Sequence, residues 1–184
     1  MTQGNSGIIH VYTDGCCEPN PGPAGWAFMV YRNGVELESH SGSFDHATNN
    51  VAELTGILKA LQWIAPNAPG EDVILFSDSM YCVQGATEWL GRWKAKGWAR
   101  GGHKAKEKNR TLANVELWKA IDLAMIAAPN AAIRWCKGHA GIRGNEAADR
   151  LATQAMQSGS IDPGDPADGD WLTREYRSIM RVAV

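Results

Sequence analysis

Several features that would place the chain in a membrane or outside the cell are missing from the sequence. No apolar run reaches the ~20 residues that a membrane-spanning helix needs, and the opening residues MTQGNSG lack the basic and apolar regions of a signal peptide. The four cysteines show no disulfide spacing, and two of them are adjacent. We therefore expect a cytoplasmic protein with free thiols and no membrane contact.

Strong net charge is also missing, but the charge is unevenly distributed. The total is -2, yet residues 92–110 hold eight Lys and Arg residues against a single acid, a local charge of +7 that leaves -9 on the rest. A basic segment on an acidic body predicts a polyanion bound at one place.

Hydrophobic periodicity predicts an α/β fold with a mixed five-stranded sheet flanked by helices. The first three strands form an antiparallel meander, with a hairpin turn at residues 32–34, and the later strands return by helical crossovers. The expected strands are residues 8–12, 26–31, 35–44, 73–76 and 131–136. The expected helices are residues 48–65, ended by Pro66, then 80–93, a helix capped by Asn114, and about 145–157.

The composition divides the chain into three parts. Residues 1–157 carry the folded domain, and residues 158–170 (SGSIDPGDPADGD) form an acidic Gly/Pro/Asp linker. Residues 171–184 form a tail with the apolar spacing of a short helix, which is free to dock on the domain, to bind a partner or to stay loose.

Four acids occupy positions from which they could converge. Asp14 and Asp78 each follow an apolar strand, and parallel neighbours would bring both to one edge of the sheet. Glu53 lies near a helix start and Asp149 on the last helix. Three of them have a simpler alternative: Asp14 as a turn former, Glu53 in a capping box with Asn50, and Asp149 as a solvated acid.

Together, four carboxylates near one edge cannot all stay ionised without a cation. Oxygen-only ligation favours magnesium or manganese. Such a cluster suits two divalent ions that activate a water and stabilise the leaving oxygen of a phosphodiester.

At this point the chain resembles a known family, ribonuclease HI (type 1 ribonuclease H), over about residues 8–156. The resemblance rests on several motifs in order, which are YTDGCCEPNPGPAGWAF, ATNNVAEL, FSDSMY, the Trp-rich basic segment and WCKGHAGIRGNEAADRLA. It implies a ribonuclease H-like fold, with residues 1–157 as a catalytic domain, and an endonuclease that cleaves the RNA strand of RNA/DNA hybrids. The products would carry 5′-phosphate and 3′-hydroxyl ends.

The same resemblance implies roles for individual residues. The metal-binding catalytic acids would be Asp14, Glu53, Asp78 and Asp149, and His139 matches the family's histidine that assists proton transfer or product release. Met80 is a departure, because glutamine is frequent after the Asp-Ser pair and a thioether cannot replace its hydrogen bonds.

The substrate contacts that the resemblance implies are spread over the chain. Thr48 would hold a DNA phosphate, and the tryptophans would contact DNA sugars unless they only pack in the core; Asn49 has helix capping as its alternative. The full expected set is Asn20, Thr48, Asn49, Trp93, Lys94, Lys96, Trp98, Lys137 and Asn145.

Two other classes of function compete with a nuclease. A hybrid-binding module without catalysis would not need four acids, which hinder phosphate binding. An ATP-dependent phosphotransferase would need a second related domain, and none is visible in 184 residues. We expect a monomeric, magnesium-dependent hybrid ribonuclease, with manganese as an alternative metal.

Overall fold

Three consecutive antiparallel strands begin the fold, as the alternation of apolar runs and turn residues predicts. They are β1 (Ile9–Cys17), β2 (Gly22–Arg32) and β3 (Val35–Ala47). Asn33 and Gly34 join β2 to β3 with φ values of 52° and 76°, the left-handed backbone of a tight hairpin turn. The computed structural model describes residues 7–101, 106 and 110–159, and the predicted linker and tail lie outside them except for Ser158 and Gly159.

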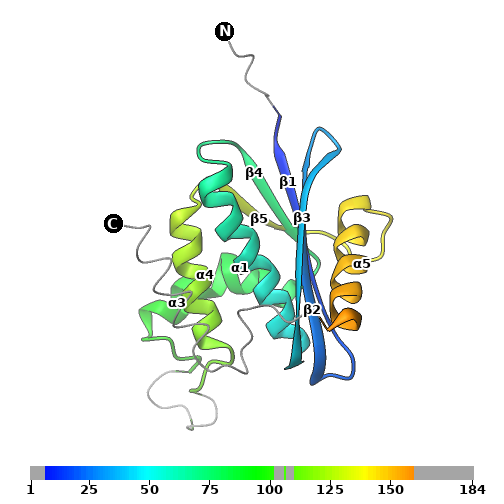
Figure 1. The fold of residues 1–184 in the computed structure, drawn as a ribbon. Coiled ribbons are helices and arrows are strands. Elements are labelled where there is room, and N and C mark those ends of the chain that lie inside the picture. The colour runs from blue at the N-terminus through cyan, green and yellow to red at the C-terminus, as the bar shows by residue number, and fades with distance from the viewer. Residues whose placement is uncertain (1–6, 102–105, 107–109, 160–184) are drawn as a thin grey trace.

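Two further strands complete one sheet in the order β3-β2-β1-β4-β5 (Figure 1). β4 (Val73–Ser77) is parallel to β1, and β5 (Ala131–Trp135) is parallel to β4. The predicted mixed sheet, antiparallel first and then parallel, is confirmed.

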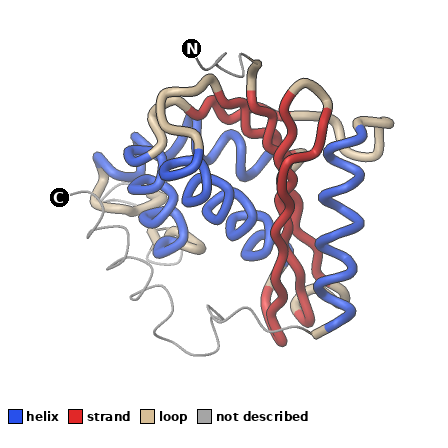
Figure 2. Tube along the Cα trace, turned by 45° about the horizontal axis from the view of Figure 1, so that its top comes forward, coloured by secondary structure: helices blue, strands red, loops and turns tan. Residues whose placement is uncertain are grey.

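Helices cover both faces of the sheet (Figure 2). One face is covered by α1 (Asn49–Asn67), against which α4 (Val115–Ala127) packs. The other face carries α5 (Arg143–Ser158), which contacts β1, β2 and β3. No helix of the described residues is both long and apolar enough to cross a bilayer.

Several predicted boundaries differ from the structure, among them the start of β2, which begins at Gly22 and not at Trp26. β1 does not end before Asp14 but continues to Cys17, because β2 goes on pairing with it after the parallel partner β4 has ended. Pro66 does not end its helix but lies within the last turn of α1, although it supplies no backbone N–H there. The last helix is longer at both ends than predicted, running from Arg143 to Ser158.

The predicted helix at residues 80–93 is divided into three parts. An α-helical start and end, α2 (Met80–Gln84) and α3 (Leu90–Ala95), flank a π-helical turn, η1 (Gly85–Trp89). Such turns occur frequently at functional sites, and two of the tryptophans described below lie in η1 and α3.

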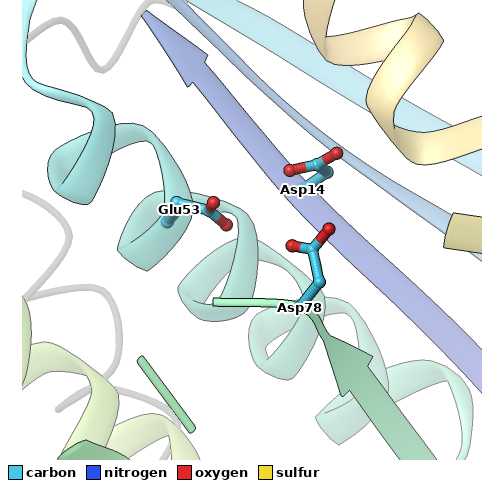
Figure 3. Close-up of side chains that lie close together, drawn as sticks. All are labelled: Asp14, Glu53 and Asp78. Carbon is cyan, nitrogen blue, oxygen red and sulfur yellow. The ribbon is translucent and has the colours of Figure 1, made fainter. Parts of the chain in front are cut away.

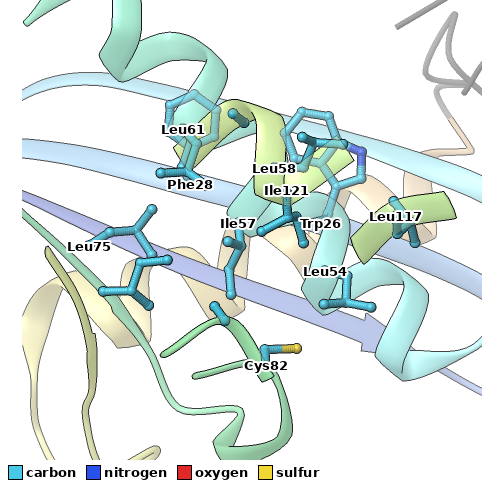
Figure 4. Packing of buried hydrophobic residues seen from close by; sticks show 14 of the residues in the cluster. Trp26, Phe28, Leu54, Ile57, Leu58, Leu61, Leu75, Cys82, Leu117 and Ile121 are labelled. Carbon is cyan, nitrogen blue, oxygen red and sulfur yellow. The ribbon is translucent and has the colours of Figure 1, made fainter. Parts of the chain in front are cut away.

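The core lies between the sheet and α1 (Figure 4). Leu54, Ile57, Leu58 and Leu61 of α1 are fully buried, and Leu75 of β4 packs in the same cluster. Burying one such side chain contributes about 1.5–3 kcal/mol, so this apolar face anchors α1 firmly across β1.

One glycine lets α1 approach β1 closely. A Cβ added at Gly15 would lie 2.2 Å from the backbone nitrogen of Glu53 and 2.5 Å from the carbonyl carbon of Ala52. Both atoms belong to the backbone and cannot rotate aside. The absence of a side chain at Gly15 therefore sets how near Glu53 comes to the strand that carries Asp14.

We predict that Gly15→Ala destabilises the fold by about 1–3 kcal/mol, because overpacking forces the backbone of α1 away from β1. Urea unfolding followed by circular dichroism measures the change. Gly91→Ala is the matched control, since Gly91 is exposed in α3 and its added Cβ would meet nothing within 4 Å. The control should be neutral or up to about 1 kcal/mol more stable. Equal midpoints for Gly15→Ala and the parent would contradict the close approach.

Candidate active site

Three carboxylates from separate elements converge at one place (Figure 3). Asp14 lies in β1, Glu53 in α1, and Asp78 directly after β4. One carboxylate oxygen from each lies within 4.8 Å of the others. Asp14 is 7% exposed and Glu53 is 5% exposed, so this acidic cluster is largely withdrawn from water.

The parallel pairing of β1 with β4 positions two of these acids. Thr13 and Ser77 form the last pair of the parallel register. Asp14 and Asp78 are the residues that follow this pair in the sequence. Strand ends in parallel sheets are the usual place for ligand-binding residues. The expected meeting of Asp14 and Asp78 at one edge is what the structure shows, although β1 itself continues.

The capping role considered for Glu53 is wrong. Thr48 is the N-cap of α1, and its hydroxyl accepts a hydrogen bond from the Val51 backbone N–H at 3.3 Å. Glu53 therefore lies beyond the first turn and faces the acidic cluster. Asn49 does not cap the helix either, because its side chain hydrogen-bonds to Glu53 and its backbone N–H donates to Asn20 Oδ1 at 3.2 Å.

Burial and mutual repulsion make the ionised cluster unfavourable. Burial, then the charge of Asp78, raises the pKa of Asp14 to about 7, although the Gly15 N–H donates to Asp14 Oδ1 at 2.7 Å and opposes the rise. Burial, then the charges of Asp14 and Asp78, raises the pKa of Glu53 well above its usual value. Desolvation and like charge both disfavour the ionised form of a carboxyl, so the two causes act in the same direction.

These residues fit a divalent cation. Glu53 Oε2 is buried without a hydrogen-bond partner, and an unpartnered buried carboxylate oxygen is costly. The three residues offer only oxygen ligands, the kind that magnesium and manganese prefer. A bound cation would satisfy the orphan oxygen and cancel the repulsion.

The fourth predicted acid lies beside this cluster and not within its 4.8 Å spacing. Asp149 of α5 is partly exposed, yet its charge contributes to the raised pKa of Asp14. Its Oδ2 lies 3.8 Å from His139 Nδ1. His139 is exposed and has a positive φ of 50°, so the loop presents its ring at the surface next to Asp149.

Asn145 has a different environment from the one expected of a substrate contact. It is 1% exposed, and its Nδ2 donates to Asp78 Oδ2 at 3.2 Å. This places it behind the acidic cluster as a support for Asp78. Lys137, by contrast, is exposed at the start of the loop that carries His139.

An aromatic pocket of about 350 Å³ lies next to the basic segment. Trp93 stands 5.7 Å from Trp89 and 5.2 Å from Trp118 between ring centroids. Trp98 is absent from the pocket wall. Its backbone N–H donates to the backbone carbonyl oxygen of Trp93 at 2.7 Å. The lining residues are Tyr81, Trp89, Trp93, Arg100, Leu112 and Ala113.

Sequence reasoning missed two of the pocket's aromatic rings. Neither Trp89 nor Tyr81 belongs to the expected set of substrate contacts, yet both line the pocket beside Trp93. Trp89 and Trp93 are four residues apart, a spacing that puts neighbours on one helical face, and this spacing was the available signal. Lys94, an expected phosphate contact, instead has its Nζ 2.6 Å from Asp122 Oδ2.

The comparison with protein families agrees with this geometry. The family model described as RNase H matches residues 6–157. The chain belongs to the RNase H family. Ribonuclease H of Polaromonas naphthalenivorans (strain CJ2) is 38% identical over 150 residues, covering 81% of this chain and 87% of that protein. Ribonuclease H of Methylobacillus flagellatus is 38% identical over 152 residues, covering 83% and 93%.

Solved structures support the RNase H assignment. LC9-RNase H1, a type 1 RNase H with the type 2 active-site motif, has a TM-score of 0.68 and 29% identity, over 84% of this chain and 74% of that one. LC11-RNase H1 in complex with an RNA/DNA hybrid has a TM-score of 0.58 and 25% identity, over 82% and 97%. The predicted family and ribonuclease H-like fold are confirmed.

The raised pKa of Asp14 predicts how stability depends on pH without metal. Because folding raises this pKa to about 7, its contribution to stability is full below about pH 4 and is lost as pH rises through 7. In EDTA at pH 8, Asp14→Asn should therefore be more stable than the parent by on the order of 2–4 kcal/mol. At pH 4 the two should be nearly equal.

Thermal unfolding at both pH values measures this difference. Asp45→Asn is the matched control, since Asp45 is exposed on β3 and its replacement should leave stability within about 0.5 kcal/mol. A parent as stable as Asp14→Asn in EDTA at pH 8 would contradict the repulsion.

Proposed function

We propose that this chain is a divalent-metal-dependent endonuclease that hydrolyses the RNA strand of RNA/DNA hybrids, leaving 5′-phosphate and 3′-hydroxyl ends. The observation that carries the proposal is the convergence of Asp14, Glu53 and Asp78, with its orphan Glu53 oxygen, in a chain whose RNase H match spans nearly the whole domain. A ribonuclease H relative with a bound RNA/DNA hybrid supports this substrate.

The acids would hold magnesium, with manganese as an alternative. Asp14, Glu53 and Asp78 are the central ligands, and Asp149 completes the set from α5. When bound, two such ions supply Lewis-acid activation of the attacking water and charge stabilisation at the leaving oxygen. His139, beside Asp149 and open to solvent, holds or releases a proton at its ring nitrogen as the strand is cut.

Binding of the hybrid would use surfaces on either side of the acids. The hydroxyl of Thr48 holds a DNA phosphate at the start of α1, and Asn20, which accepts from the Asn49 N–H, lies beside it. Asn20 and Asn49 supply polar groups to sense the RNA 2′-hydroxyl. Lys137 contacts the sugar-phosphate backbone of the hybrid near His139.

The aromatic pocket would receive the DNA strand. Trp93, with Tyr81 and Trp89, offers ring faces to sugars, and Trp98 braces Trp93 from the following turn. Lys94, Lys96 and Arg100 supply cations to the phosphates. Asn145 acts on the substrate through Asp78.

We further propose that residues 1–157 are the catalytic domain and act as a monomer in the cytoplasm. In this proposal, residues 158–170 are a linker and residues 171–184 are a C-terminal tail. Both assignments rest on composition.

A cleavage assay with separately labelled strands tests the activity. The parent should cut the RNA strand and spare the DNA strand with magnesium, and EDTA should abolish cutting. Asp14→Asn and Asp78→Asn should each lose more than the ~10–100-fold that an outer-shell partner is worth, because each removes a ligand. Asp45→Asn, an exposed acid on β3, is the control with unchanged activity.

RNA that survives, or an Asp14→Asn variant as active as the parent, would refute the mechanism. Hybrid that is bound but never cut would instead identify a binding module.

Lys96→Ala should weaken hybrid binding without slowing the chemistry, because its ammonium contacts phosphate. The KM should rise with kcat unchanged, and the slope of log K against log salt should become shallower by about 1. Lys94→Ala tests whether Lys94 leaves Asp122 for a phosphate, in which case its slope falls as well. Lys119→Ala, whose ammonium pairs with Glu116 on α4, is the control. An unchanged slope for Lys96→Ala would remove it from the contact surface.

A further inference from the structure

The Asn145 side chain makes one hydrogen bond to the acidic cluster, and it matters which end of the amide makes it. Its Nδ2 donates to Asp78 Oδ2 at 3.2 Å. A carboxylate accepts but does not donate, so only the NH₂ end of the amide can serve it. The two ends of an amide have nearly the same shape, so the contact at the other end adds to the preference that the carboxylate sets.

The other end of the amide meets a thiol. Cys136 Sγ lies 3.1 Å from Asn145 Oδ1, and a thiol is a weak donor to a carbonyl oxygen. Burial raises the pKa of Cys136 to about 11, which keeps the proton on sulfur. A flipped amide would turn its oxygen to the carboxylate, which has no donor for it, and would replace the S–H···O contact by a weak N–H···S contact.

Cys136 is itself held rigidly at the end of the sheet. It is 7% exposed, and its backbone N–H donates to Ser77 O at 3.0 Å, extending the pairing of β5 with β4 by one residue. Ser77 is the residue before Asp78. The thiol is therefore fixed to the same strand end that presents the carboxylate.

The neighbours of Cys136 also enclose Asp78. Trp135 Nε1 donates to the Asp78 carbonyl oxygen at 3.0 Å. A Cβ added at Gly138 would lie 2.4 Å from Asp78 Oδ2. Residues 135–138 thus restrict both the backbone and the carboxylate of Asp78, and Asn145 closes the remaining side from α5.

We propose that Cys136 is a positioning residue for the metal-binding cluster: its thiol donates to Asn145 Oδ1, holds the amide with Nδ2 towards Asp78, and so orients the Asp78 carboxylate. The inference rests on the proposed role of Asp78 as a metal ligand. Outer-shell partners of this kind orient the ligands of metal sites. Cys136 acts through Asn145 and touches neither substrate nor metal.

Three variants distinguish the effect of losing the hydrogen-bond donor at position 136 from the effect of changing the volume of the side chain. Cys136→Val fills the site without a donor, Cys136→Ser keeps a donor, and Cys136→Ala is the smaller variant without a donor, used if the valine variant does not fold. The first readout is the side-chain amide resonances of Asn145 in metal-free protein. They should shift or broaden in Cys136→Val and stay near the parent positions in Cys136→Ser.

The second readout is manganese binding by calorimetry without substrate. Cys136→Val should bind manganese about 3–10-fold more weakly, below the 10–100-fold of a direct outer-shell partner, and Cys136→Ser should stay within about twofold of the parent. In the Asn145→Ala background, Cys136→Val should cost nothing further, because the relay is already broken. The KM for the hybrid at saturating metal should not change.

Parent-like manganese affinity and amide resonances in Cys136→Val would overturn the proposal. So would a penalty of equal size in the Asn145→Ala background, which would mark Cys136 as ordinary packing. Asp78→Asn keeps this failure distinct from that of the proposed function. If Asp78→Asn binds manganese as the parent does, Asp78 is not a ligand, whatever the Cys136 variants show.

Discussion

Repulsion among buried carboxylates is the constraint on which the site depends. Asp14 and Glu53 are withdrawn from water and face each other and Asp78, an arrangement that a fold selected only for stability would avoid. Without a cation, the raised pKa values of Asp14 and Glu53 record this cost. The surrounding structure must be rigid enough to hold the acids together, and the apolar contacts of α1 provide that rigidity.

The arrangement of β1 explains where the acids lie. This strand pairs with β4 only as far as Thr13, but with β2 as far as Cys17. Asp14 is thus the first residue past the parallel pairing, while its backbone is still held by β2. One strand therefore serves both halves of the mixed sheet, and the acidic cluster occupies the point at which they separate.

Most of the architecture followed from local sequence patterns. The strands and helices were predictable because each carries its own apolar period, and the Asn33-Gly34 turn carries its own backbone preference. Boundaries were less predictable. β1 passes Asp14 because its later residues pair with β2, and the apolar pattern of a strand does not specify its partner; Pro66 lies within the last turn of its helix.

Residue types and their order determined which acids belong together, since Asp14, Glu53 and Asp78 each stand at a recognisable place in the sequence. Only the tertiary structure decided that Asn145 supports Asp78, that Lys94 pairs with Asp122, and that tryptophans and a tyrosine share a pocket. The physical reason is that periodicity records whether a side chain is buried, which depends on its own element. Its hydrogen-bond partner depends on a residue of another element, and no local pattern specifies that residue.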